Sequence, residues 1–497
     1  MALVKNTGQP APALQLFTSL RATPPDGSEL GSLLKAYRAE KRLSQTKLAE
    51  LLHWDQSYVS LVEQGNRQIR DVEELRRIAA LLDLPEDELG LLPVIDAVAA
   101  SAVVGSGAEP REVVAEQRAW RSARRSLNRH RAELSIAAAR LYPDVERVGQ
   151  TPLLAPKDWM FTQPVNLDEV ILFWRSDARQ PVVTGAEAAS EPVRPMSMRG
   201  RLPRYSTALR LVDRPVLFVN RPSYRLLEIA SDSEGTRLEF GYTSYFDMVD
   251  VCEAIAHELA AAWGRAEHSE TWLNAPSWDQ LNLRSLIGDP FDLARRALLP
   301  SIDTLTIRRA EDGKASFTMH RRAAANVALA GALLHVMPAG VFQPSSTMPW
   351  DQANDFDLWR NMMREYAEEF LGDPEADGES GEPIDYSGSE PYRSLERARV
   401  DGSIRPWCLG VGLDPLTLAG EILTVVVADA DVYDEIFADM VERNAEGAVA
   451  GSDAQRPQDG IAFTEENVVR LLADEPLAPA AAALLHLAWE HRDRLLA

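Results

Sequence analysis

Apolar residues recur at helical spacing between residues 28 and 92, and polar residues divide this pattern into short helices. Ser44 is suited to the N-cap of a helix over 45–52, and three residues then interrupt the pattern. A second short helix over 56–63 follows, with Gly65 in a C-cap position. Two short helices separated by three residues, inside a small helical bundle, predict a helix-turn-helix arrangement.

The apolar positions of this segment predict its core, and the polar positions predict a surface. The core set is Leu48, Ala49, Leu51, Leu52, Val59, Val62, Leu75, Ile78, Ala79 and Leu82. The outward set of the second short helix is Gln56, Ser57, Ser60 and Gln64, together with Tyr58. Such polar groups can hydrogen-bond base edges in a major groove, which favours a DNA-recognition helix. The alternatives are a structural bundle and a protein-binding module of the same fold.

The stretch LSQTKLAELLHWDQSYVSLVEQGNRQI, residues 43–69, resembles the phage-repressor helix-turn-helix family (Cro-like, xenobiotic-response-element type). The matching features are Gln45, the LAELL run, the Val59–Ser60 pair, Glu63 and Gly65. The chain departs from the family at His53, where the family usually has glycine in the turn. The resemblance implies sequence-specific binding to double-stranded DNA, with Arg67 and Arg70 on phosphates. Together with the outward polar set, the candidate DNA-contacting side chains are Gln45, Lys47, Gln56, Ser57, Tyr58, Ser60, Arg67 and Arg70.

The charge of the chain changes from segment to segment. The net charge is -23, from 52 basic and 75 acidic residues, which argues against a protein coated in nucleic acid. Residues 28–70 hold seven basic and five acidic side chains, a net charge of +2. Because that excess is modest for a DNA-binding module, we expect affinity to depend on dimerisation or on other basic surface.

Residues 110–142 predict one long helix, since Pro110 suits a first helical position and Pro143 stops the pattern. Between Arg111 and Arg131 lie seven arginines and two acidic residues. Apolar residues recur at every seventh position, as in half of a coiled-coil seam: Val113, Trp120, Leu127, Leu134 and Leu141. Three interpretations stay open. The helix packs on its own chain, it pairs with a second chain, or its arginines contact the DNA backbone.

The rest of the chain mixes strand-like runs such as VILFW and ILTVVVAD with helical runs. We expect six regions: a flexible tail over 1–27, the helix-turn-helix domain over 28–92, a linker over 93–109, a long basic helix over 110–142, a middle α+β region over 143–280 and a C-terminal α+β domain over 281–497. The predicted fold class is multidomain, with an all-α N-terminal domain, a connecting helix and a large α+β body.

Two C-terminal segments, HVMPAGVFQP (335–344) and REYAEEFLG (364–372), resemble parts of the Nudix family. Three glutamates lie at i, i+3 and i+4 in the second segment: Glu365, Glu368 and Glu369. On one face of an α-helix they could hold Mg²⁺ together with the phosphates of a nucleotide. The gap from Gly340 to Arg364 is longer than in the family, so the motif is partial. A solvated acidic face, a ligand-sensing pocket on a degenerate Nudix-like fold, and hydrolysis all stay open, with catalysis the least expected.

The composition of the chain bears on its cellular location and on its class of function. Only two cysteines, and uncharged runs too short or too interrupted to span a bilayer, predict a cytoplasmic protein without a membrane partner. Residue usage is of the kind associated with GC-rich bacterial genomes. The hypothesis is a transcription regulator that binds DNA as a homodimer and senses a small-molecule effector such as a nucleotide derivative. The alternatives are a Nudix-like pyrophosphohydrolase carrying a DNA-binding module, and an interaction scaffold.

Overall fold

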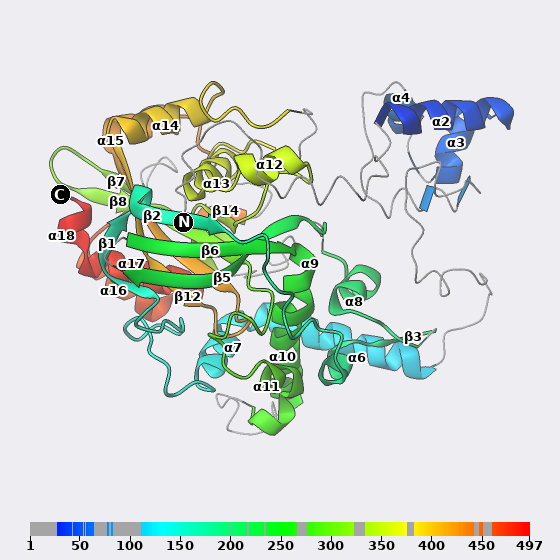
Figure 1. Ribbon diagram of the computed structural model, residues 1–497, viewed down its shortest axis with the longest axis horizontal. Helices are drawn as coiled ribbons and strands as arrows, with labels where there is room; N and C mark the ends of the chain where they lie inside the picture. The colour runs from blue at the N-terminus through cyan, green and yellow to red at the C-terminus, as the bar shows by residue number, and fades with distance from the viewer. Residues whose placement is uncertain are drawn as a thin grey trace. The chain divides into compact units, whose positions relative to one another are not determined.

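A computed structural model of the chain divides into two compact units, Met1–Gly107 and Ala108–Ala497, here called the helix-turn-helix unit and the large unit (Figure 1). The structure describes residues 27–41, 43–52, 54, 56–63, 77–78, 81–82, 111–198, 200–215, 218–232, 235–265, 276–322, 333–374, 382–441, 447–450 and 460–497. The predicted linker and nearly all of the predicted tail lie outside these ranges. The predicted middle and C-terminal regions, on either side of residue 280, both belong to the large unit.

The helix-turn-helix unit contains α2 (Gly27–Glu40), α3 (Gln45–Leu52) and α4 (Gln56–Glu63). Its core joins residues of these helices with two later positions: Leu30, Leu34, Leu48, Ala49, Leu52, Val59, Val62, Ile78 and Leu82. The predicted core is thus confirmed wherever it is described, except at Leu51, which is 39% exposed. Gly31 allows α2 to approach α4 closely, since a Cβ there would overlap the carbonyl oxygen of Val62.

The large unit is built on a mixed sheet that has seven strands among the described residues, in the order β1-β12-β13-β7-β8-β15, with β11 also paired to β7. The bounds are β1 Met160–Asn166, β7 Pro300–Arg309, β8 Ala315–Phe317, β11 Ala339–Val341, β12 Ile404–Leu413, β13 Gly420–Asp429 and β15 Ile461–Ala462. β13 runs parallel to β7, and the other pairs are antiparallel. β1 comes from the predicted middle region and β12 from the predicted C-terminal domain, so one sheet joins the two.

Alternating side chains give this sheet two apolar faces. On β13, Leu423, Val425 and Val427 join a core formed with the C-terminal helices, whereas Ile422 and Val426 join the main core on the opposite face. The C-terminal helices, drawn in red in Figure 1, are α16 Glu465–Asp474, α17 Pro479–Glu490 and α18 Arg492–Leu495. The helices whose buried side chains enter the main core include α13 Leu358–Glu365, α14 Tyr392–Val400 and α15 Ala430–Ile436, and α12, Pro349–Asn354, precedes α13.

Smaller sheets and helices complete the unit. Their order is β2-β6-β5, β10-β9-β14 and β3-β4. The strands are β2 Val170–Trp174, β3 Met196–Ser197, β4 Gly200–Arg201, β5 Pro222–Asp232, β6 Gly235–Ser244, β9 Met319–Arg322, β10 Leu334–Val336 and β14 Gly447–Ala450. The helices are α8 Tyr205–Val212, α9 Tyr245–Met248, α10 Ala254–Arg265 and α11 Asn282–Ile287. A π-helical turn, Val249–Glu253, joins α9 to α10, and a second, Tyr366–Phe370, follows α13.

The predicted long basic helix is two helices, α6 (Arg111–Arg129) and α7 (Arg131–Ala139), which meet at His130. Its apolar seventh positions are buried in the large unit: Val113, Trp120, Leu127 and Leu134. Trp120 donates its indole N–H to the carbonyl of Val193 at 2.8 Å, and α6 packs beside α10 (Figure 1). The interpretation of these apolar positions as a seam for a second chain is therefore wrong, because the chain's own body covers them.

Two of the seven arginines are buried on the same side of the helices as these apolar residues. Arg124 and Arg131 both contact the carboxylate of Glu253, which lies in the π-helical turn before α10, at 3.1 and 3.0 Å.

Among the described residues, no helix is long and apolar enough to cross a bilayer.

Candidate nucleic-acid interface and ligand pocket

Ser44 caps α3 as predicted. The Lys47 backbone N–H donates to the Ser44 hydroxyl at 3.1 Å, and Leu48 donates to the Ser44 carbonyl at 3.0 Å. The cap fixes where α3 begins and therefore which side chains stand in its first turn. Gln45 is the first helical residue of α3, and Gln56 is the first of α4.

A chain of hydrogen bonds ties the first residues of α3 and α4 to the body of the unit. Arg38 donates to both carboxylate oxygens of Glu63, at 2.7 and 3.0 Å. The Gln45 amide N–H donates to Glu63 at 2.8 Å, and the Gln56 amide N–H donates to the Gln45 amide oxygen at 3.0 Å. Arg38 lies in the last turn of α2. Through these hydrogen bonds, a substitution of Arg38 would affect the orientation of the Gln56 side chain.

The anchor of this chain is a buried ion pair. Glu63 is only 3% exposed, whereas the Arg38 side chain is 27% exposed. Burial alone would raise the pKa of the Glu63 carboxyl, but the hydrogen bonds from Arg38 and Gln45 outweigh burial and hold its pKa below the ordinary value. Glu63 is therefore ionised at neutral pH and stays available as an acceptor for Gln45.

The sequence motif contained Glu63 but gave no role to it or to Arg38. The signal available was its spacing, because Glu63 lies four residues after Val59 and so on the buried side of α4. A charged residue on the buried side of a helix needs a partner of opposite charge. The partner itself lies 25 positions earlier, on a different helix, and spacing does not identify it.

The structure places the predicted DNA-contacting residues as follows. Lys47 and Gln56 are exposed, and Gln45, Tyr58 and Ser60 are half-buried. The Tyr58 ring packs edge-on to Trp54 with centroids 4.9 Å apart, which anchors its apolar part. Ser57 lies in α4, but its side chain, like Arg67 and Arg70, falls outside the described residues. Gln45 and Gln56 are the pair that the fold brings into direct contact.

The three glutamates of the Nudix-like segment lie on either side of a change in helix type. α13 ends at Glu365, and Glu368 and Glu369 belong to the π-helical turn, so the α-helical spacing that predicted one shared face does not continue through them. Glu369 is buried and accepts from the Ala339 backbone N–H at 3.4 Å, and Glu365 packs against Gly340. Among the described residues, which include all three, no group of three acidic, histidine or cysteine side chains is arranged to hold a metal ion.

Arg364, the residue before Glu365, belongs to a separate buried network. Its guanidinium donates to the Gln343 carbonyl at 2.6 Å and lies 3.8 Å from the buried Asp355 carboxylate. Asp355 in turn accepts hydrogen bonds from the Tyr386 hydroxyl and from Ser345. This network supports the inner wall of a cavity.

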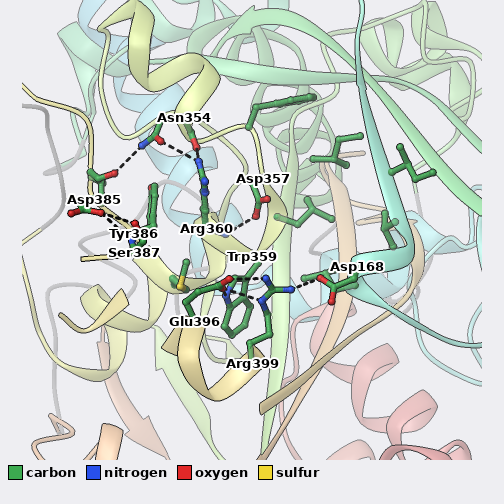
Figure 2. Close-up of a pocket in the computed structure, with 18 residues that line it drawn as sticks. Asp168, Asn354, Asp357, Trp359, Arg360, Asp385, Tyr386, Ser387, Glu396 and Arg399 are labelled. Carbon is green, nitrogen blue, oxygen red and sulfur yellow. Dashed lines mark hydrogen bonds and ion pairs between the residues drawn. The ribbon is translucent and has the colours of Figure 1, made fainter. Parts of the chain in front are cut away.

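The cavity has a volume of about 570 Å³ and is formed by four segments far apart in the sequence (Figure 2). They are 167–172 from β2 and the turn before it, 354–363 from the end of α12 and most of α13, 384–387 from a loop, and one side of α14. Its size is typical of sites for small organic ligands. No local sequence pattern connects these four segments, so none of the lining residues was predicted to form a site.

Ionic groups lie at two ends of the cavity (Figure 2). At one end Glu396 joins Arg399 at 2.8 Å and accepts from the Trp359 indole N–H at 2.9 Å, and Arg399 also contacts Asp168. At the other end Arg360 donates to the Asn354 carbonyl and side-chain oxygens at 2.6 and 3.1 Å and lies 5.2 Å from the Tyr386 ring centroid.

Arg399 forms ion pairs with carboxylates, whereas Arg360 forms none with the described residues. None of the ion pairs between described residues includes Arg360, although its side chain is half-buried on the cavity wall. Asp357, on the same wall, uses one carboxylate oxygen as the N-cap of α13 by accepting the Arg360 backbone N–H at 2.9 Å. The wall therefore presents a positive and a negative group beside apolar side chains from β2.

The helix-turn-helix unit is similar in sequence to part of a phage protein. A 59-residue stretch of the chain is 42% identical to a protein of Bacillus phage phi105 described as "ImmF control region 10 kDa protein". The match covers 12% of this chain and 64% of that protein, so the chain spans a little under two thirds of the relative's length. Residues 29–92 match a family described as "Helix-turn-helix domain", and the N-terminal unit is therefore a helix-turn-helix domain.

Proposed function

We propose that the protein is a sequence-specific DNA-binding transcription regulator. The single observation that carries this proposal is the Arg38–Glu63–Gln45–Gln56 chain, which holds two glutamines together at the starts of α3 and α4. The match of residues 29–92 to a helix-turn-helix domain supports it. A structural bundle would have no need of an exposed glutamine held in place from behind.

The chemistry of the glutamine pair suits a base edge. A glutamine amide can bond adenine at N6 and N7 simultaneously, because it offers an acceptor and a donor side by side. Gln56 is exposed and uses one N–H on Gln45. Its orientation is thereby fixed before DNA arrives, which lowers the entropy lost on binding. Lys47, exposed in the first turn of α3, supplies charge for a phosphate.

The proposal is tested by selecting duplexes from a randomised library with the full-length protein. We expect one enriched word that contains adenine at a fixed position, and binding to it that weakens as salt rises. A selection that enriches no word at any salt concentration would contradict the proposal. A word with two-fold symmetry would add that the protein binds as a dimer, as helix-turn-helix modules commonly do.

We further propose that the large unit receives a small effector in the cavity of Figure 2. Arg360 and Asp357 on one wall suit a molecule that carries both a negative and a positive group, and the side chains of Ile171 and Leu172 suit an apolar part between them. The nucleotide derivative suggested by the Nudix-like segment remains one class to include, without a metal site among the described glutamates.

This second proposal is tested with a panel of amino acids, amphoteric amines and nucleotides. A true effector should raise the melting temperature of the large unit and change the affinity for the selected DNA word. Arg360→Gln should abolish both responses, whereas Arg397→Gln, on the exposed side of α14, should keep them. A compound that acts equally on both variants binds elsewhere.

A further inference from the structure

The outward side of α6 carries a row of arginines. Arg111, Arg118, Arg125 and Arg129 are exposed, while Val113, Trp120, Arg124 and Leu127 of the same helix are buried. Steps of seven and four residues keep the four exposed arginines on one side of an α-helix. At 1.5 Å per residue the row is about 27 Å long. We call these four residues the α6 arginine row.

The row differs from the other arginines of this segment in having no side-chain partner among the residues that the structure describes. Arg124 and Arg131 bind Glu253, and Arg121 donates to the Val212 carbonyl at 3.4 Å. For the side chains of the four row arginines, the structure gives no hydrogen bond or ion pair with any described residue. Nearby Glu116 is already paired with Arg201 at 3.0 Å. The positive charge of the row is therefore not neutralised by the helix that carries it.

Folding alone does not explain this arrangement. Like charges four residues apart on a helix, such as Arg125 and Arg129, destabilise it slightly. The row also stands out in a chain whose net charge is -23. Apart from Glu112 beside Arg111, the other exposed positions between its arginines are the small residues Ala115, Ala119 and Ser122, so from Arg118 to Arg129 no bulky exposed side chain keeps a partner at a distance.

A partner with regularly spaced negative charge fits this surface, and we propose that the α6 arginine row binds the phosphate backbone of DNA flanking the site recognised by α4. This inference rests on the proposed function. It also supplies the basic surface that the helix-turn-helix segment lacks, because residues 28–70 have a net charge of only +2. Guanidinium groups suit phosphates well, since their parallel N–H groups can contact two phosphate oxygens. An acidic protein partner is the alternative that the experiment must separate.

The experiment compares full-length wild type with the triple variant Arg118→Gln, Arg125→Gln, Arg129→Gln. A matched control, Arg179→Gln, Arg397→Gln, Arg470→Gln, removes the same charge at exposed positions outside α6. Each protein is titrated with a duplex limited to the selected word and with one carrying about 20 flanking base pairs on each side, two helical turns, over a range of salt. Equal melting temperatures establish that all three proteins are folded.

We expect wild type and the control variant to bind the flanked duplex about tenfold more tightly than the short one. The row variant should lose that advantage, and its salt dependence on the flanked duplex should fall by about two to three units, roughly one per phosphate contact. Unchanged affinity and salt dependence would overturn the inference and direct attention to an acidic protein partner. Failure of wild type to select any word would instead overturn the proposed function, so the two failures are distinguishable.

Discussion

In the helix-turn-helix unit Glu63 is buried against one arginine, Arg38, whereas in the large unit Glu253 is buried between two, Arg124 and Arg131. The first cluster continues outward through Gln45 to the exposed Gln56. In the second, the two arginines and the glutamate are each 2% exposed or less, and Arg124 also lies 3.7 Å from the carboxylate of Asp213. The same pair of charged groups thus orients an exposed glutamine in one unit and lies between packed helices in the other.

The largest effect is expected from Glu253→Gln. Removing this charge takes away the buried carboxylate that both Arg124 and Arg131 contact, which should lower the free energy of unfolding of the large unit by about 3–5 kcal/mol. Denaturant unfolding followed by tryptophan fluorescence measures the change. Glu116→Gln is the control, since its pair with Arg201 is exposed and should contribute at most about 1 kcal/mol. A loss for Glu253→Gln as small as that of the control would mean that the cluster does not hold α6 and α10 together.

A pH effect of opposite sign is expected in the two units. Burial raises the pKa of Asp250, in the same π-helical turn as Glu253, to about 6. Its stabilising contribution is complete below the unfolded pKa of about 4 and is lost as the pH rises through 6, a difference of about 3 kcal/mol. Glu63 has a lowered pKa, so its contribution is present above the ordinary glutamate pKa and is lost on acidification.

Asp250→Asn provides the measurement. The variant keeps an oxygen that can accept the Ser206 backbone N–H, which now donates to Asp250 at 2.6 Å, but it cannot ionise. The difference in unfolding free energy between variant and wild type should therefore grow in favour of the variant from pH 4 to pH 7. A difference that stays constant with pH would show that Asp250 titrates normally.

A smaller effect is expected at the outer end of the Glu63 cluster. Gln56→Ala should cost about 1–3 kcal/mol on the selected duplex and relax the preference at one base pair. Lys47→Ala should instead weaken all duplexes similarly and reduce the salt dependence by about one unit. If Gln56→Ala weakened specific and random duplexes alike, Gln56 would be a phosphate contact and not a specificity residue.

The smallest effect is expected from Glu63→Gln. A glutamine can still accept from Arg38, whose side chain is partly exposed, so the loss in unfolding free energy should be only about 1–2 kcal/mol. Discrimination between the selected and random duplexes should fall as well, because Gln45 loses its charged acceptor. Binding that keeps its full discrimination would separate the cluster from recognition and leave it with a structural role alone.

Features that depend on residues close together in the sequence, such as helix boundaries and buried positions, were predicted correctly. The boundaries of α3 and α4 and the Ser44 cap follow from caps and spacing, and the buried positions follow from the apolar pattern. The prediction that Leu51 belongs to the core was wrong. Leu51 lies near the end of a short helix, at a position beside the core but outside it. A long helix over 110–142 was also predicted, but not its break at His130.

Contacts between residues far apart in the sequence were not predicted. Arg124 meets Glu253 across 129 positions, and the cavity around Arg360 gathers four separate segments. The glutamates of the Nudix-like segment show a different limit. Helical spacing assumed an α-helix through Glu369, and the π-helical turn after Glu365 changes the direction in which the later side chains lie.

The pairing of β1 with β12 has a consequence for how the protein is made. These strands lie more than two hundred residues apart, so β1 must wait on the ribosome until β12 has been synthesised. The helix-turn-helix unit relies on contacts within its own short segment and can fold soon after it emerges. A chain cut short before residue 404 by a nonsense mutation would therefore retain its N-terminal module beside an incomplete sheet, a species prone to aggregation and proteolysis.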